Sequence, residues 1–225
     1  MNPKHIFSIL LSCQILSYTG FSQTIDFSGA AIFLCEKKNI QLQKAVQVLQ
    51  DEIQRRSNIL LPVVNKPSGY KQVIVVVVEE RMEKLPESWR APILKLPETG
   101  REGFKIVRPD KNTVLIAGND EPGALYGVGW LLRKMEIKNG HLFIPDSINF
   151  SSTPVYPIRG HQMGYRPKTN AYDAWSVAQF DEYIRDLVIF GANSIEIMPP
   201  RTDDDFSSIH MKLPAIKMIS EQSRI

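Results

Sequence analysis

Side chains that suit ligand binding gather in two segments near the C-terminal end of the chain, residues 165–175 and 199–205. An arginine can hold hydroxyl or carboxylate groups with its planar set of donors, and an aromatic ring can stack on a ring-shaped ligand. The residues of these types in the two segments are Arg166, Tyr172, Trp175 and Arg201. A role in packing the loop is the alternative for each of them.

The sequence has no pattern typical of a metal site. The acidic run at residues 203–205 lacks the glycine and the later glutamate of a calcium-binding loop, so we expect it to be a solvated turn. The chain has two cysteines, Cys13 and Cys35, which are too few for a cysteine-based metal site. We therefore expect neither a metal nor a cofactor.

A glycine-rich segment, residues 118–123, has the glycine spacing of a phosphate-binding loop and lies between a predicted strand and a predicted helix. However, Ala124 and Leu125 stand where such a loop needs a lysine and a serine or threonine to bind phosphate and magnesium. We expect Asn119 or Asp120 to cap the helix instead, and we expect no nucleotide ligand. Three glycines would let this helix pack closely on a sheet: Gly123, Gly127 and Gly129.

Each of the two candidate segments follows a predicted strand. After a polar linker at residues 151–154, the predicted order is a strand over 157–164, a loop, a helix, a strand over 194–198, a second loop and a last helical segment. Ser176 and Gln179 form the pattern of a capping box at the start of the first helix. This order is the beginning of a parallel β/α series, in which the loops that follow the strands project from one end. The two segments would therefore border the same pocket.

A small α/β domain is expected before this series. An apolar run at residues 30–35 predicts a buried strand, and apolar residues at helical spacing within 39–57 predict a helix. The uninterrupted β-branched run Val73–Val78 predicts a strand that is covered on both faces, at the centre of a sheet. Two further strands, over 103–108 and 113–117, are joined by residues with hairpin-turn chemistry. The next helix is predicted to bury Leu125, Val128, Leu132 and Met135, and a last edge strand is predicted over 141–144.

Length and composition indicate an ordinary globular protein. The chain has 225 residues, of which 43% are hydrophobic and 23% charged, so it can bury a sizeable core. The net charge of +3, without long charged runs, is too weak to indicate a nucleic-acid partner. At about 100 to 200 residues per domain, the length predicts one domain and a fraction of another.

Residues 1–22 have the features of a signal peptide. Lys4 precedes an apolar stretch at residues 6–21, and small residues stand just before Gln23. Polar residues interrupt this stretch, which falls short of the roughly 20 apolar residues of a membrane span, so we expect no transmembrane span after cleavage. We expect cleavage before Gln23 and export to the periplasm or the extracellular space, with lipoprotein processing at Cys13 as the alternative. Cleavage would leave Cys35 as the only cysteine, without an internal disulfide.

Three short motifs carry a resemblance to known families: Gly-Phe-Lys-Ile at 103–106, the segment 113–127 with its Ala-Gly-Asn-Asp turn, and Ile-Arg-Gly-His-Gln-Met-Gly-Tyr-Arg-Pro at 158–167. The first two resemble the non-catalytic α/β domain that precedes the barrel in bacterial β-hexosaminidases and α-glucuronidases. The third resembles the opening strand of the catalytic barrel. The resemblance implies an α/β fold: a domain of mixed sheet and helices at 23–150, and an incomplete TIM-type (β/α) barrel at 151–225.

The resemblance also implies a carbohydrate site. In hexosaminidase-like families, the arginine of an Arg-Gly pair on the first barrel strand hydrogen-bonds sugar hydroxyls, and Arg159 stands in that place, with a structural ion pair inside the barrel as the alternative. Gly164 stands where an aspartate usually follows, which departs from the amino-sugar pattern. His161 would contact the sugar or be a satisfied histidine inside the barrel. The expected substrate-binding residues are Arg159, His161, Arg166, Tyr172, Glu196 and Arg201.

Catalytic residues are not expected within this chain. Hydrolysis of a glycoside usually needs two carboxylates, or one acid and a substrate group, and in the families resembled these acids arrive on later barrel strands. Glu196 is the only carboxylate in a predicted barrel strand here, and we expect it to bind ligand or to pair with Arg159 or Arg201. A complete barrel takes about 250 residues, whereas residues 154–225 supply two β/α units.

Two hypotheses about function follow from these observations. The first is that the chain is the N-terminal part of an exported glycoside hydrolase. Its complete barrel would bind a carbohydrate substrate, and the chain would be inactive as given. The alternative is a secreted, non-catalytic α/β module that binds a glycan or a protein.

Overall fold

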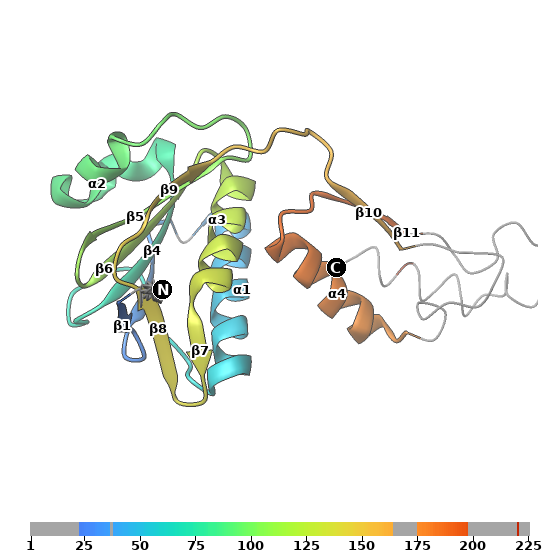
Figure 1. Cartoon of the computed structure of the whole chain (residues 1–225), viewed down its shortest axis with the longest axis horizontal. Helices are drawn as coiled ribbons and strands as arrows, with labels where there is room; N and C mark the ends of the chain where they lie inside the picture. Colours follow the sequence, from blue (N-terminus) through green and yellow to red (C-terminus); the bar gives the residue numbers. More distant parts are fainter. Residues whose placement is uncertain (1–22, 37, 164–174, 198–219, 221–225) are drawn as a thin grey trace, which may run out of the picture.

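The structure, a computed structural model, describes residues 23–36, 38–163, 175–197 and 220. These residues form an α/β domain followed by a smaller unit of two parallel strands and one helix (Figure 1). This arrangement confirms the predicted fold class, a mixed sheet with helices followed by the opening unit of a β/α barrel. The predicted signal peptide, the loop at 199–205 and, apart from residue 220, the last helical segment fall outside the described residues and stay predictions.

A six-stranded mixed sheet forms the centre of the α/β domain, in the order β3-β2-β4-β6-β5-β9. Its strands are β2 (Ala31–Leu34), β3 (Val63–Val64), β4 (Val73–Val78), β5 (Phe104–Asp110), β6 (Thr113–Gly118) and β9 (Asn149–Ser152). The first four strands in this order run parallel, and β5 runs antiparallel to both β6 and β9. All six residues of β4 are buried, so the β-branched run is a central strand covered on both faces, as predicted.

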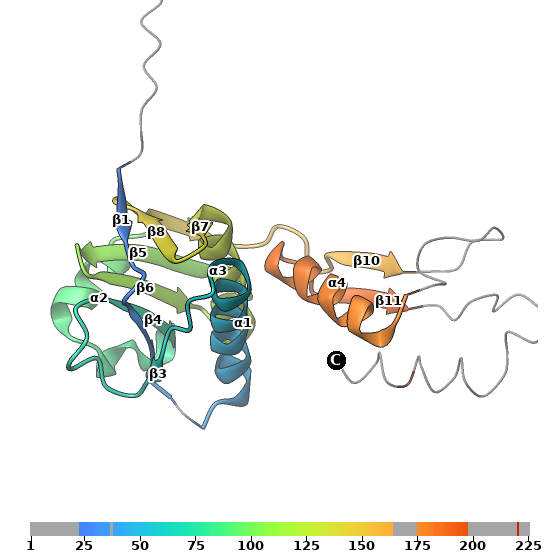
Figure 2. The same ribbon diagram turned by 90° about the horizontal axis from the view of Figure 1, so that it is seen from below.

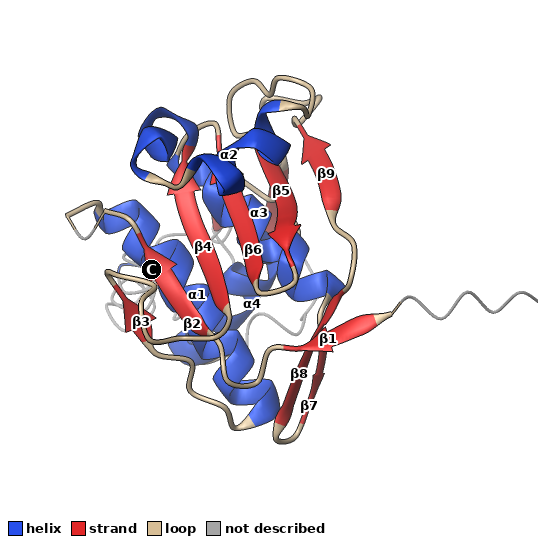
Figure 3. Ribbon diagram, turned by 90° about the vertical axis from the view of Figure 1, so that its left-hand side faces the viewer, coloured by secondary structure: helices blue, strands red, loops and turns tan. Residues whose placement is uncertain are grey.

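Helices cover both faces of this sheet. The long helices α1 (Ile40–Ser57) and α3 (Glu121–Lys134) lie on one face, and the 3-10 helix η1 (Glu79–Lys84) and α2 (Glu87–Leu94) cover the other (Figure 3). Successive residues of β4 point to opposite faces, so Ile74 and Val76 pack in the core beneath α1 and α3, while Val75 and Val77 pack in the core beneath α2. Among the described elements, α1 and α3 are the helices that contact α4 (Figure 1).

Helix α3 begins at the glycine-rich segment. The Asp120 carboxylate accepts a hydrogen bond from the Gly123 N–H at 2.8 Å, so Asp120 is the predicted cap. Of the four residues predicted to be buried, Leu125 is only partly buried and the other three are buried. Because α3 lies between the sheet, α1 and the following unit, it also buries residues that the single predicted stripe missed: Ala124, Tyr126 and Leu131.

The strand predicted at 141–144 exists, but it is not an edge strand. β8 (His141–Pro145) is the middle strand of a separate three-stranded antiparallel sheet, between β1 (Thr24–Asp26) and β7 (Glu136–Lys138). The prediction was wrong because it depended on β8 alone, whereas the position of a strand in a sheet depends on its partners. The three residues of β1 are too few and too polar to indicate a strand without β8.

The α/β domain also extends further than predicted. Ser151 and Ser152, assigned to a polar linker from the sequence, belong to β9 and pair with Lys105 and Phe104 of β5. Serine is tolerated there because β9 is an edge strand with one side open to solvent. The linker therefore begins at Thr153.

The second part is a parallel β-α-β unit made of β10 (Gly160–Met163), α4 (Val177–Ile189) and β11 (Ser194–Ile197) (Figure 2). The predicted capping box is present: the Ser176 hydroxyl accepts from the Gln179 N–H, and the Gln179 side chain accepts from the Ser176 N–H. β10 and β11 are neighbours, as a parallel β/α series requires. In the described part of the chain, no helix is both long and apolar enough to cross a membrane.

Candidate functional site

Gln162 of β10 and Glu196 of β11 lie side by side on one face of the two-stranded sheet. They are register partners, and partners in a parallel pair point to the same face. The opposite face carries His161, whose Nε2 lies 3.1 Å from the Tyr183 hydroxyl of α4. Gln162 and Glu196 therefore face away from α4, on the side that is the interior of a β/α barrel, and both are exposed. An amide and a carboxylate placed there can hydrogen-bond the hydroxyl groups of a ligand.

His161 lies between the strand and the helix. In addition to the hydrogen-bond contact, its ring meets the Tyr183 ring edge-on, with the centroids 5.5 Å apart. Trp175 lies next to this pair and packs edge-on against Phe180 and Tyr183, at centroid distances of 5.4 and 5.1 Å. Both rings thus belong to the layer that attaches α4 to β10. The structure does not bring His161 to the face that carries Glu196.

Arg159 lies directly before β10 and binds groups from both parts of the protein. Its Nη2 is 2.8 Å from Glu102 Oε2 of the α/β domain, and its Cζ lies 5.1 Å from the centre of the Tyr126 ring. Its Nε donates to the Gly191 carbonyl at 2.7 Å, and its Nη1 donates to the Tyr156 carbonyl at 2.9 Å. Arg159 therefore forms an ion pair, but its partner is Glu102 of the α/β domain, whereas the alternative prediction placed such a pair inside the barrel. Sugar contact by Arg159 stays a prediction.

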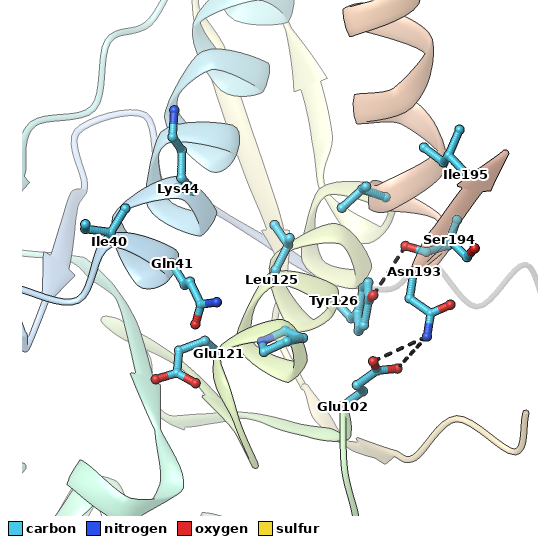
Figure 4. A pocket seen from close by; sticks show the side chains of 13 residues that line it. Ile40, Gln41, Lys44, Glu102, Glu121, Leu125, Tyr126, Asn193, Ser194 and Ile195 are labelled. Carbon is cyan, nitrogen blue, oxygen red and sulfur yellow. Dashed lines mark hydrogen bonds between the residues drawn. The ribbon is translucent and has the colours of Figure 1, made fainter. Parts of the chain in front are cut away.

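Glu102 is the member of this cluster that sequence reasoning missed. Its φ is 60°, in the left-handed region that residues other than glycine rarely adopt. The Glu102 N–H donates to Asp120 Oδ2 at 2.8 Å, so the carboxylate that caps α3 also holds this turn. The Glu102 side chain accepts from Asn193 Nδ2 at 3.1 Å (Figure 4). A glutamate at a positive φ gives no pattern in the sequence, and its partners lie far along the chain.

Tyr126 completes the cluster from α3. Its hydroxyl donates to the Ala192 carbonyl at 3.3 Å, next to Asn193 (Figure 4). Burial, together with the nearby Glu102 carboxylate, raises the pKa of the Tyr126 phenol, while Arg159 acts in the opposite direction. The phenol therefore stays neutral and remains a donor across the junction. We call Glu102, Tyr126, Arg159 and Asn193 the junction cluster.

A cleft of about 470 Å³ opens beside the junction cluster. Figure 4 shows side chains of α1 on one side and residues 193–195 on the other, with Leu125 and Tyr126 between them. Its lining is mostly apolar, with Lys44 and Glu121 among the few charged groups, and its volume is typical of small-molecule sites. Of the residues predicted to bind substrate, the three that the structure describes, Arg159, His161 and Glu196, do not line this cleft.

Ion pairs and close packing fix α4 against the α/β domain. Arg185 Nη1 lies 3.0 Å from Asp51 Oδ2 of α1, and Arg55 of α1 pairs with Glu182 of α4. Gly129 of α3 touches the end of α4 so closely that a Cβ atom there would come within 2.4 Å of the Ile189 carbonyl oxygen. Since α4 in turn packs on β10, these contacts set the position of the β-α-β unit.

One carboxylate at this interface has a perturbed pKa. Burial raises the pKa of Asp186 on α4, and the negative charges of Glu182 and Glu52 raise it further, while Arg55 and Arg56 oppose this effect. Glu52 is fully buried and pairs with both arginines. The α1–α4 contact therefore places three carboxylates around two arginines.

The six predicted residues have different outcomes. The structure brings Glu196 to the exposed inner face, places Arg159 in the junction cluster, and puts His161 between β10 and α4. Glu196 and Arg159 do not pair with each other. The remaining three, Arg166, Tyr172 and Arg201, fall outside the described residues, so their roles stay predictions.

The described residues include no group of three or more His, Cys, Asp or Glu side chains arranged to hold a metal ion. Cys35 is a free cysteine, and burial raises the pKa of its thiol, so it stays a neutral thiol at physiological pH. The chemistry that the described groups offer is hydrogen bonding by Gln162 and Glu196.

Comparison with known proteins finds similarity in structure rather than in sequence. No family model matches the chain, and no curated protein matches it. A β-N-acetylhexosaminidase of family GH20 from Streptomyces coelicolor A3(2) shares its fold, with a TM-score of 0.54 and 17% identity over 77% of this chain and 31% of that one. A GH20 exo-β-N-acetylglucosaminidase from Vibrio harveyi gives a TM-score of 0.51 and 16% identity over 77% of this chain and 22% of that one.

A further solved structure comes from another family. A GH115 4-O-methyl-α-glucuronidase gives a TM-score of 0.55 and 11% identity over 78% of this chain and 26% of that one. Residues 1–152 make up about two-thirds of the chain, so matches over 77% of it extend beyond the α/β domain. The chain spans a third or less of the length of these structures and shares the fold of an α/β domain with the opening of a barrel, which confirms the predicted resemblance at the level of the fold.

Proposed function

We propose that this chain is the N-terminal part of an exported glycoside hydrolase that degrades polysaccharides or oligosaccharides. The observation that carries the proposal is the order of its parts: a mixed α/β domain joined through the junction cluster to a parallel β-α-β unit. Solved structures that share this fold are a β-N-acetylhexosaminidase and a 4-O-methyl-α-glucuronidase. The α/β domain would position the first barrel strands, and the complete barrel would bind the carbohydrate.

The substrate would bind on the inner face of the barrel, with Glu196 and Gln162 at its floor. Both side chains are exposed on the face opposite α4, where hydroxyl groups of a sugar could reach them. Arg166, Tyr172 and Arg201 would border the same pocket from the loops that follow β10 and β11. His161 has no part in this version of the site, because its ring contacts α4. Arg159 would position β10 through its contacts with Glu102 and the Gly191 carbonyl, and its contact with the sugar stays a prediction.

The chain by itself should be inactive. Glycoside hydrolysis needs a second carboxylate or a participating substrate group, and Glu196 is the only carboxylate in the described barrel strands. We therefore expect no release of 4-nitrophenol from aryl β-N-acetylhexosaminides or aryl α-glucuronides by the purified chain. The protein translated from the uninterrupted reading frame that contains this chain should hydrolyse one of these classes.

A substitution within the chain tests whether Glu196 binds the substrate. In the protein from the longer reading frame, Glu196→Gln should lower kcat/KM at least about tenfold, because a charge-assisted hydrogen bond to a hydroxyl is lost. Glu98→Gln, on the exposed surface of the α/β domain, is the matched control and should leave kcat/KM unchanged. Activity of the short chain, or a reading frame that encodes no further β/α units, would contradict the proposal.

Export can be tested separately with residues 1–22 fused to alkaline phosphatase, which is active only after export. We expect phosphatase activity from the fusion and none after deletion of residues 6–16, since the apolar stretch is what the export machinery binds. Cys13→Ser should leave both activity and soluble release unchanged. Retention of the fusion in the membrane fraction, reversed by Cys13→Ser, would instead support the lipoprotein alternative.

A further inference from the structure

A second hollow, of about 600 Å³, lies on the α/β domain, on the sheet face that α2 covers. Its floor includes Val73 and Thr113, which are register partners in β4 and β6. Its walls come from α2, the segment before β4 and the β5–β6 turn. The wall residues that matter here are Lys66, Tyr70, Lys71, Trp89, Asp110 and Asn112. Helix α4 packs on the opposite side of the sheet, so this hollow is separate from the β-α-β unit (Figure 1).

The charges of the hollow favour an anion. Lys66 and Lys71 are exposed, and neither has an ion-pair partner among the residues that the structure describes. The acid in the hollow, Asp110, is engaged locally: its Oδ1 accepts from the Asn112 N–H at 2.7 Å, and its Oδ2 accepts from the Thr113 hydroxyl at 3.1 Å. The two ammonium groups are therefore available to a ligand, while both oxygens of Asp110 already bind groups of their own turn.

Two aromatic rings give the hollow an apolar side. Trp89 is half-buried against the core beneath α2, so its ring combines a fixed position with an accessible surface. The Tyr70 side chain is 39% exposed and adds a second accessible ring. A pyranose ring offers an apolar face of C–H groups that can pack on such rings, and its hydroxyls can bind a nearby amide such as Asn112. Rings, an amide and free cations together suit a saccharide that carries carboxylates.

The position of the hollow argues against a peptide as the ligand. An extended peptide commonly binds by adding a strand to an open sheet edge. The floor strands β4 and β6 are each paired on both sides, β4 with β2 and β6, and β6 with β4 and β5. Their main-chain groups are therefore already used, and a ligand must bind through the side chains.

We propose that this hollow binds an acidic oligosaccharide, one whose uronate carboxylates contact Lys66 and Lys71 while a sugar ring packs on Tyr70 and Trp89. This site is independent of the barrel and needs no catalytic group. Its role would be to hold the protein on an acidic polysaccharide. The hollow is open to solvent, so an extended oligosaccharide could lie along it.

Calorimetric titration of the purified chain with tetragalacturonic acid tests the proposal, with maltotetraose as the uncharged probe and hexaglutamate as the acidic peptide. We expect tetragalacturonate to bind at least about tenfold more tightly than maltotetraose, and its affinity to fall as salt is added. Lys66→Ala/Lys71→Ala should weaken binding by roughly tenfold, since two exposed charge contacts are lost. Tyr70→Ala should weaken the binding of tetragalacturonate as well.

The matched control removes the same charge elsewhere. Lys38→Ala/Lys95→Ala takes two exposed lysines from outside the hollow and should leave the affinity unchanged. Equal weakening by both double variants, equal affinity for maltotetraose, or no binding of tetragalacturonate would overturn the proposal. Tighter binding of hexaglutamate that depends on Lys66 and Lys71 would also overturn it, in favour of an acidic peptide. None of these outcomes depends on glycosidase activity, so this proposal and the proposed function fail separately.

Discussion

The Glu102 carboxylate joins three segments of the chain: its own turn, the linker at Arg159 and the start of β11 at Asn193. Its positive φ costs on the order of 1 kcal/mol, so the contacts of its side chain and its N–H must offset that cost. The Arg-Gly pair at residues 159–160 was sufficient to predict that Arg159 has a specific role. Its partner could not be predicted, because a turn at a positive φ is fixed by tertiary contacts rather than by local pattern.

Replacing Glu102 tests how much its ion pair with Arg159 contributes to the free energy of unfolding. Glu102→Gln keeps an acceptor for Asn193 but leaves the Arg159 guanidinium, which is largely buried, without its counter-charge. We expect the free energy of unfolding to fall by about 1–2 kcal/mol, measured by urea denaturation at neutral pH. Glu98→Gln, at an exposed site, should change it by less than about 0.5 kcal/mol. Equal midpoints for Glu102→Gln and wild type would contradict a stabilising role of the pair.

Asp186 should make the α1–α4 interface sensitive to pH. Its pKa is raised in the folded state, chiefly by burial, so the folded protein holds this proton more tightly than the unfolded chain does. The protonated Asp186 side chain therefore favours the folded state below pH 3.8, the ordinary pKa of an aspartate. This contribution to the free energy of unfolding decreases as the pH rises through the raised pKa, and it is absent at higher pH. Asp186→Asn removes this decrease, so its urea midpoint should exceed that of wild type at pH 7 and approach it at pH 4. A constant difference across this range would count against the assignment.

Elements whose formation depends on neighbouring residues in the sequence were predicted correctly. The β-branched run of β4, the cap of α3 and the capping box of α4 were all predictable, because each depends on residues within a few positions. The two-residue strand β3, the strand β1 and the edge strand β9 were not predicted, since each exists only through pairing with a distant partner. The same limit explains the wrong placement of β8.

The contact between α3 and α4 depends on Gly129, for which the sequence predicts packing on the sheet. A Cβ at Gly129 would meet the Ile189 carbonyl oxygen at 2.4 Å, so Gly129→Ala must push the end of α4 away. We expect a loss of about 1–3 kcal/mol in the free energy of unfolding and faster proteolysis between residues 153 and 159. Gly29→Ala is the control, because a Cβ there meets nothing within 4 Å. Unchanged proteolysis would show that α4 docks without this close approach.

For the molecule as a whole, helices cover both faces of the α/β sheet, whereas only one face of the β10–β11 sheet is covered in the part of the chain that the structure describes. β10 and β11 pair only with each other among the described residues, and β10 follows a linker with exposed apolar side chains. The inner face of the two strands has no opposing layer in the described part of the chain. The incomplete barrel was predictable from the number of β/α units in the sequence. The contacts by which α1 and α3 hold the β-α-β unit in place were not predictable.

The open unit should make the chain associate with itself. Val155 and Ile158, in the linker that leads into β10, are 86% and 74% exposed, and β10 pairs only with β11 among the described residues. Exposed apolar side chains next to a free strand edge favour contact between molecules. We expect light scattering after size exclusion to show an average mass that rises with concentration. Val155→Lys/Ile158→Lys should return the mass toward that of the monomer, because charges at such an edge oppose pairing. Leu94→Lys, at a residue that is 61% exposed on α2, should leave the association unchanged. A concentration-independent monomer, or equal rescue by Leu94→Lys, would show that the linker and β10 are not the surface through which molecules associate.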